Sequence, residues 1–96
     1  MTIEFVDRTH AHRFELQSGD EVLGFIAYRL ACEVMTLVHT EVDPAHGGQG
    51  HAATLVRGAL DDTRARGLTV VPACPYVATY IDKHPEYADL VASSPR

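Results

Sequence analysis

The spacing of apolar and polar residues predicts a series of strands in the first half of the chain. Four segments alternate β-branched or aromatic residues with polar ones, at residues 3–7, 13–17, 22–30 and 33–42. This period of two is typical of strands with one buried face, and short connections between them favour antiparallel pairing. A Ser-Gly-Asp turn at residues 18–20 separates the second strand from the third. The boundary between the third and fourth strands carries little turn chemistry and is the least defined.

The spacing becomes helical in the second half. From His51 to Arg66, apolar residues recur at intervals of three and four, and charged residues fill the opposite face. Gly67 follows where a C-terminal glycine is expected. Residues 68–74 then form a nearly all-apolar strand, which we expect to be buried on both faces. The strand–helix–strand order predicts a right-handed crossover that pairs the strands at 33–42 and 68–74 in parallel.

The last part of the chain predicts a second helix at residues 76–84, before Pro85, and a short turn at 86–91. Together the elements predict an α+β fold: antiparallel strands, then a parallel strand–helix–strand crossover and a C-terminal helix. At 96 residues the chain has room for one domain. We place this domain at residues 1–92, with 93–96 as a frayed tail.

Composition argues against several classes of partner and site. The formal net charge is −5, with acidic residues spread along the chain, which disfavours nucleic acid or an anionic membrane as the main partner. Neither a targeting segment nor an apolar run long enough to span a bilayer is evident, so we expect a cytoplasmic protein. Cys32 and Cys74 lie far apart and are expected to be free thiols. The six histidines lack metal-site spacing, so no metal is expected.

A glycine-rich loop between the fourth strand and the first helix is the most informative motif. Residues 47–50 read Gly-Gly-Gln-Gly and open directly into the helix, with no Ser, Thr, Asp or Asn to cap its first turn. Free backbone N–H groups at a helix start bind anions, so a phosphate or diphosphate is the expected ligand. The motif lacks the Gly-Lys-Ser/Thr of a P-loop and the Rossmann spacing. The alternative is that these glycines only turn the chain.

The order of elements and this loop together resemble the GCN5-related N-acetyltransferase (GNAT) superfamily. Its diphosphate loop follows the fourth strand with the pattern Gln/Arg-x-x-Gly-x-Gly/Ala, which Gly50 and Ala52 match and Gly47 does not. More narrowly, the chain resembles a small single-domain subgroup typified by the bacterial protein YjdJ in three segments, at residues 39–42, 71–76 and 80–87. This resemblance covers the second half of the chain, whereas the first strands are generic.

The resemblance implies an acetyl-CoA site where the fourth and fifth strands separate. The pantetheine arm would bond to backbone near Glu41 and Val42, and the diphosphate would meet amides of the loop and the first helical turn. The residues it implies for acetyl-CoA binding are Glu41, Val42, Gly47, Gly48, Gln49, Gly50, His51, Ala52 and Ala53. The implied activity is acetyl transfer to an amine, which attacks the thioester while CoA leaves as a thiolate that needs a proton.

Four side chains are candidates for this chemistry. Tyr80 resembles the GNAT tyrosine that protonates departing CoA; the alternative is a tyrosine packed in the core. His39 and Glu41 share a face of the fourth strand, so one could be a general base and the other its positioning partner, or both could form a solvated surface pair. Cys74 precedes the last helix, whose positive end could make it the nucleophile of a two-step transfer. Direct transfer with an inert, buried Cys74 is favoured.

The acceptor-binding part of the site has few predicted elements. Larger GNAT enzymes bind the acceptor with helices between the first two strands, but here only residues 8–12 separate them, which predicts an open groove. A protein lysine, an N-terminus or a small polyamine could enter it, and a second subunit could complete it in a homodimer. Two other functions remain: a CoA-binding or sensing module without catalysis, and a protein-interaction domain that has lost affinity for CoA.

Overall fold

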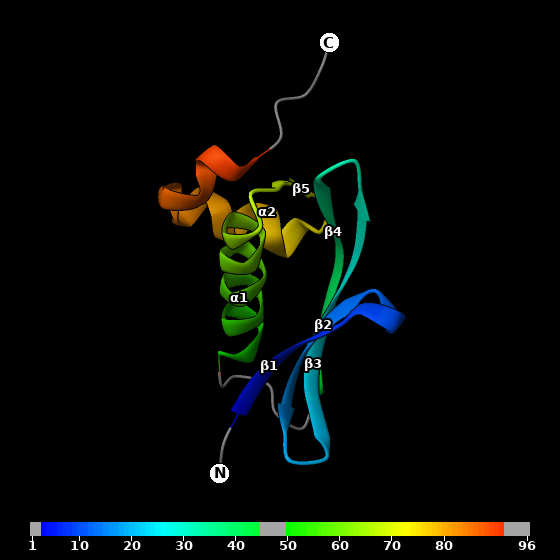
Figure 1. Ribbon diagram of the computed structural model, residues 1–96. Coiled ribbons are helices and arrows are strands. Elements are labelled where there is room, and N and C mark those ends of the chain that lie inside the picture. Colours follow the sequence, from blue (N-terminus) through cyan, green and yellow to red (C-terminus); the bar gives the residue numbers. More distant parts are fainter. Residues whose placement is uncertain (1–2, 45–49, 92–96) are drawn as a thin grey trace.

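A computed structural model describes residues 3–44 and 50–91 of the chain (Figure 1). A five-stranded sheet has its strands in the order β1 (Ile3–Arg8), β2 (Arg13–Ser18), β3 (Glu21–Ala31), β4 (Val34–Val42) and β5 (Thr69–Pro72). The α-helices are α1 (His51–Ala65) and α2 (Pro75–Lys83), and two short 3-10 helices are η1 (Thr9–Ala11) and η3 (Pro85–Leu90). Strands β1 to β4 pair antiparallel and β4 pairs with β5 in parallel, which confirms the predicted fold class.

Both α-helices lie on one side of the sheet (Figure 1). Between the two layers is a core whose largest fully buried apolar side chains are Phe14, Leu16, Ile26, Met35, Leu37, Leu55, Leu60, Val56, Val70 and Val77. Burial of each such side chain contributes about 2 kcal/mol by removing apolar surface from water. The expectation that residues 68–74 are buried on both faces is wrong: Val70 is fully buried but Val71 is 36% exposed. Neither α1 nor α2 covers the second face of the sheet (Figure 1).

A glycine with positive φ defines each end of α1. Gly50 precedes the helix with φ of 77°, a left-handed conformation that favours glycine. At the other end Gly67 has φ of 70°, its N–H donates to the carbonyl of Arg64 (3.0 Å), and the N–H of Leu68 donates to the carbonyl of Thr63 (3.0 Å). This pair of bonds is the Schellman motif, so the predicted helix stop is confirmed.

The pairing between β4 and β5 ends before β4 does. The last parallel pair is Leu37 with Pro72, whereas the antiparallel pairing of β4 with β3 continues to Val42 opposite Gly24. Residues 38–42 therefore have a strand neighbour on one side only among the described residues. We call this opening, bounded by residues 38–42 of β4 and the start of α2, the β4–β5 fork.

The predicted domain limit at residue 92 and the tail at 93–96 lie outside the described residues. Within residues 3–44 and 50–91, the helices are too short or too polar to cross a membrane.

Candidate functional site

The first turn of α1 offers backbone donors at the end of the loop. No side chain of the described residues caps it, as the sequence predicts, and the hydroxyl of Thr54 bonds back to the carbonyl of Gly50 (3.1 Å). Ala52 and Ala53 are partly exposed, while the imidazole of His51 is buried. The N–H groups of a first turn carry the positive end of the helix dipole, so this end of α1 can hold an anion. The predicted loop contacts Gly47, Gly48 and Gln49 lie outside the described residues.

The free edge of β4 lies close to this helix start. A methyl group built on Gly24, the β3 partner of Val42, would lie 2.8 Å from the carbonyl oxygen of Glu41 and 3.1 Å from a side-chain carbon of Leu55 in α1. Val42 packs against the core, whereas the side chain of Glu41 is exposed. An extended ligand can add to such a strand edge through main-chain hydrogen bonds. The fork therefore places an extended-chain site next to an anion site.

Cys74 lies at the fork, where the chain leaves β5 and enters α2. Its N–H donates to the carbonyl of Leu37 (2.9 Å), and its buried thiol lies 3.5 Å from the hydroxyl of Thr40. Burial favours the neutral thiol, but hydrogen bonds from Thr40 and from the backbone N–H groups of Val77 and Tyr76 outweigh it and lower the pKa of Cys74. Groups of β4 and of the start of α2 thus stabilise the ionised form of this thiol. Cys32 and Cys74 are both free thiols.

His39 and Glu41 form a pair on the opposite face of β4. Nε2 of His39 lies 3.2 Å from a carboxylate oxygen of Glu41, and both side chains are more than half exposed. The ring of His39 also lies 6.3 Å from that of Phe25 on β3. The prediction that His39 and Glu41 share a face is confirmed. That face is the one turned away from the helices, since Thr40 reaches the thiol of Cys74 on the helix side.

Tyr80 lies on α2, partly buried between neighbouring side chains. Its ring stacks on that of His84 at 4.0 Å between centroids, and a His84 ring nitrogen lies 2.9 Å from the Tyr80 carbonyl. Burial raises the pKa of the Tyr80 phenol, so it stays protonated at neutral pH and can donate a proton. Its hydroxyl has no hydrogen-bond partner among the described residues. Tyr80 shares a cavity of about 190 Å³ with Ala53 of α1.

The four predicted catalytic residues do not form one cluster. Cys74 and Tyr80 lie on the helix side of the sheet, and the His39–Glu41 pair lies on the open side. Sequence reasoning missed Thr40 as the partner of Cys74, because the two are brought together by the parallel pairing of β4 and β5.

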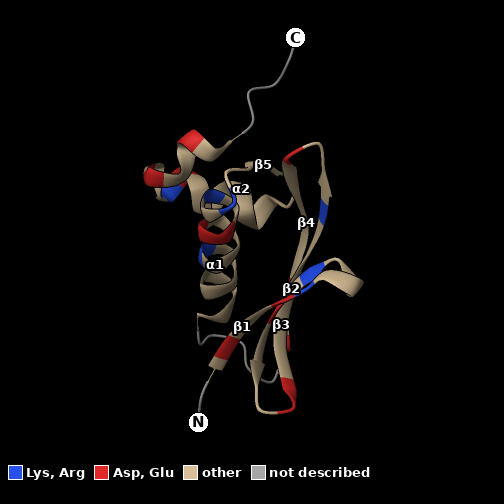
Figure 2. Cartoon of the chain, viewed as in Figure 1, with Lys and Arg blue, Asp and Glu red and all other residues tan. Residues whose placement is uncertain are grey.

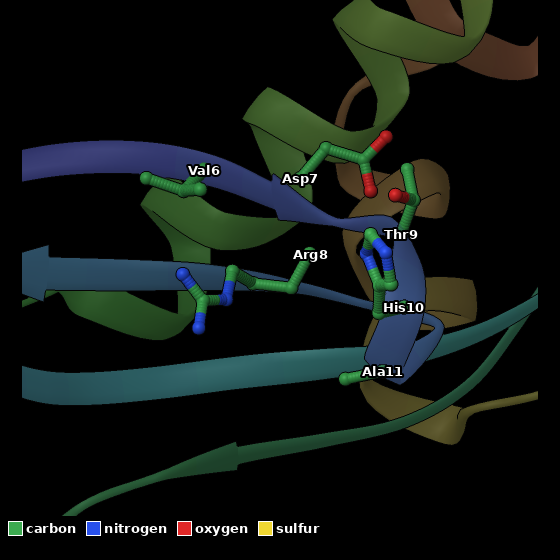
Figure 3. Close-up of a pocket in the computed structure, with 6 residues that line it drawn as sticks. All are labelled: Val6, Asp7, Arg8, Thr9, His10 and Ala11. Atoms are coloured by element: carbon green, nitrogen blue, oxygen red, sulfur yellow. The ribbon is translucent and has the colours of Figure 1, made fainter.

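A second cavity, of about 390 Å³, lies at the end of β1 and around η1 (Figure 3). Its acidic side chain, Asp7, accepts a hydrogen bond from Tyr28 (2.7 Å) and pairs with Arg66, and its Arg8 pairs with Glu15 (3.7 Å). These charges therefore serve to hold β1, β2, β3 and the C-terminal end of α1 together. Across residues 3–44 and 50–91, no group of three His, Cys, Asp or Glu side chains is arranged to hold a metal ion.

Comparisons with known proteins agree with this architecture. The family model described as GCN5-related N-acetyl-transferase matches residues 13–90, a longer stretch than the resemblance in the second half of the sequence. No curated protein gives a match. The narrower YjdJ-like resemblance stays a prediction.

Three solved structures share the fold. A GCN5-like candidate N-acetyltransferase from Staphylococcus aureus is 21% identical with a TM-score of 0.69, covering 99% of this chain and 91% of that one. The ribosomal-protein-S18-alanine N-acetyltransferase from Escherichia coli is 18% identical with a TM-score of 0.63, covering 88% and 75%. The ribosomal-protein-alanine N-acetyltransferase from Brucella melitensis biovar Abortus 2308 is 20% identical with a TM-score of 0.60, covering 88% and 63%. Because the family model matches residues 13–90, most of the chain, the chain belongs to the GCN5-related N-acetyltransferase family.

Proposed function

We propose that this chain transfers the acetyl group of acetyl-CoA to an amine at the β4–β5 fork. Family membership supports acetyl transfer as the general activity. The observation that carries the proposal is the free edge of β4 at residues 38–42 beside the uncapped start of α1. The pantetheine arm contains amides, so it can bond along this edge near Glu41 and Val42 as a strand would.

The diphosphate of CoA would then bind at the start of α1. The contacts proposed for it are the backbone amides of Gly50, His51, Ala52 and Ala53, together with the loop residues Gly47, Gly48 and Gln49. Several N–H groups and the helix dipole favour an anion there without any cationic side chain. This accounts for how an acidic protein can bind a polyanionic substrate.

The proposed reaction uses groups on both faces of β4. The amine nitrogen attacks the thioester carbonyl, its carbon–sulfur bond breaks, and the proton lost by the amine passes to Glu41 or His39 on the open face. The departing thiolate takes a proton from Tyr80, whose phenol is protonated at neutral pH. In the two-step alternative the Cys74 thiolate attacks the thioester first and the acetyl group passes from its sulfur to the amine. We favour direct transfer.

Binding is tested by isothermal titration with acetyl-CoA on Gly50→Asp and its matched control Gly50→Asn. A Cβ built on Gly50 has no atom of the described residues within 4 Å, and Asn and Asp both tolerate the left-handed conformation. We expect Asp to weaken binding at least about tenfold more than Asn, because only Asp adds a negative charge where the diphosphate binds. Equal affinities for the two variants would contradict a diphosphate at the start of α1.

Transfer is tested by release of the CoA thiol with a panel of protein, peptide and polyamine acceptors. We expect release with one acceptor class, and a much smaller kcat for Tyr80→Phe with little change in acetyl-CoA affinity. Binding of acetyl-CoA without release for any amine would instead support a non-catalytic CoA-binding module. The identity of the amine, a homodimer and a cytoplasmic location stay predictions.

A further inference from the structure

A third cavity, of about 290 Å³, lies beside the proposed base, on the face of the sheet turned away from the helices. Its walls include Arg13, Val22, Phe25, Glu41 and Asp43. Phe25 of β3 pairs in register with Glu41 of β4, so their side chains share the open face from which the amine is proposed to approach. The volume is at the lower end of the range for ligand pockets, which favours a small molecule.

Two carboxylates form one wall of this cavity. The N–H of Asp43 donates to the carbonyl of Leu23 on β3 (2.8 Å), so the chain beyond Glu41 continues beside β3. Side chains two residues apart on an extended chain share a face, about 7 Å from each other. Figure 2 shows Asp and Glu positions at this end of the sheet, near the β2–β3 hairpin, whereas the Lys and Arg positions lie farther along the strands and on the helices.

The positive charge at the cavity is already matched. Nη2 of Arg13 lies 2.6 Å from a carboxylate oxygen of Glu15, which is almost fully buried, and the guanidinium lies over the Phe25 ring, 4.6 Å from its centroid. Glu15 also lies 3.7 Å from Arg8, which does not line the cavity. The cavity therefore combines an acidic wall with apolar surface from Phe25 and from Val22, which is 37% exposed.

We propose that the acceptor is a small primary diamine or polyamine, with its reacting nitrogen at the His39–Glu41 pair and a second ammonium group paired to Asp43. The inference rests on the proposed function and names the amine that it leaves open. The separation of about 7 Å between the two carboxylate positions suits two nitrogens joined by about four carbons. The methylene chain between them covers the apolar surface of Phe25 and Val22. Near neutral pH a second ammonium favours this acidic wall, whereas a carboxylate on the acceptor would be repelled.

The two nitrogens have different roles in the reaction. The reacting nitrogen passes a proton to the His39–Glu41 pair and forms a bond to the acetyl carbon while the carbon–sulfur bond breaks. The sulfur takes a proton from Tyr80, so the products are the N-acetylated diamine and free CoA. The second nitrogen keeps its proton throughout, so its contact with Asp43 is present both before and during the chemical step. Such a contact lowers KM and leaves kcat nearly unchanged.

The experiment measures release of the CoA thiol by the full chain at saturating acetyl-CoA, with putrescine and with 4-aminobutanol. Putrescine is a four-carbon diamine, and 4-aminobutanol replaces its second ammonium by a hydroxyl of similar size. The proteins are the parent, Asp43→Asn and the control Asp82→Asn, which removes an exposed carboxylate from α2 on the other side of the sheet. Each comparison is a ratio of kcat/KM values for two acceptors on one variant, so a change in the folded fraction cancels.

We expect kcat/KM of the parent protein to be about tenfold higher for putrescine, chiefly through KM, because a charge-assisted contact to Asp43 is worth about this factor. Asp82→Asn should keep that ratio. Asp43→Asn should reduce it to about two, the factor that two equivalent nitrogens give without any contact.

Four results would overturn the inference. A ratio of about two or less in the parent protein would remove the second ammonium contact while leaving the proposed function intact. An unchanged ratio in Asp43→Asn would show that Asp43 does not hold the second nitrogen. Faster transfer to a peptide with one lysine than to putrescine would indicate a polypeptide acceptor. Absence of release with every amine would refute the acetyl-transfer proposal as well.

Discussion

Replacing Tyr28 by Phe should change how stability depends on pH in the alkaline range. Tyr28 is 5% exposed, and its hydroxyl donates to Asp7 (2.7 Å), which also pairs with Arg66 at the end of α1. Burial and the hydrogen bond to the Asp7 carboxylate raise the pKa of Tyr28 from 10.0 to about 12. Folding therefore favours the protonated phenol. The resulting contribution to the free energy of unfolding is fully present below about pH 10 and is lost as the pH rises through about 12.

The size of the effect follows from that shift. Between about pH 9 and about pH 11 the unfolded phenol ionises and the folded one does not, so Tyr28 lowers the free energy of unfolding by about 1.4 kcal/mol. Phe cannot ionise, so the variant avoids this loss. It also lacks the hydrogen bond to Asp7, at a cost of about 1 kcal/mol, because Asp7 keeps Arg66 as a partner. The variant should be less stable near neutral pH and match the parent protein near pH 11.

The assay is urea denaturation followed by circular dichroism at several pH values. Tyr87 provides a second test, because burial and its hydrogen bond to Asp61 raise its pKa to about 12 as well. Tyr87→Phe should show a similar convergence with the parent protein, and the double variant should have the flattest dependence on pH. A difference between Tyr28→Phe and the parent that stays constant from neutral to alkaline pH would refute the reasoning.

Three substitutions away from the site test the fold. Gly58→Ala would place a methyl group 2.7 Å from the Phe5 ring, so in urea we expect a net loss of about 1 kcal/mol despite better helix propensity, relieved by Phe5→Leu. Cys32→Asn with Glu33→Gly should raise the Tm by several degrees, because φ values of 52° and 67° in this two-residue hairpin suit Asn-Gly; an unchanged Tm would contradict this. Val56→Ala should cost about 2 kcal/mol in urea, since the side chain is fully buried, and a loss below about 0.5 kcal/mol would contradict its role in the core.

The helices and strands were predicted well where a pattern of apolar residues repeats along the chain or where a glycine ends the element. The helix begins at His51 as predicted and ends at Ala65, one residue early, because the Gly67 motif is encoded locally. The extent of burial was harder to predict. An apolar run such as residues 68–74 looks the same whether one or both faces are covered, and here the described helices cover only one.

The sequence predicted only those contacts of the candidate site that join residues close together along the chain. His39 and Glu41 are two residues apart on one strand, so their contact follows from the alternation of side chains. The contact of Cys74 with Thr40 depends on how far β5 runs beside β4, which no local pattern encodes.

A bulge in β4 decides which face each of these groups occupies. Alternation from the two buried residues at 35 and 37 would turn His39 and Glu41 toward the helices. Instead Val38 is an extra residue in the pairing with β3, so the face changes and Thr40 points to the helix side. In the proposed reaction this arrangement lets the amine and its base approach from the open face while the departing thiolate stays near the helices. The extra residue at Val38 therefore does as much to define the site as any of the side chains proposed to act in it.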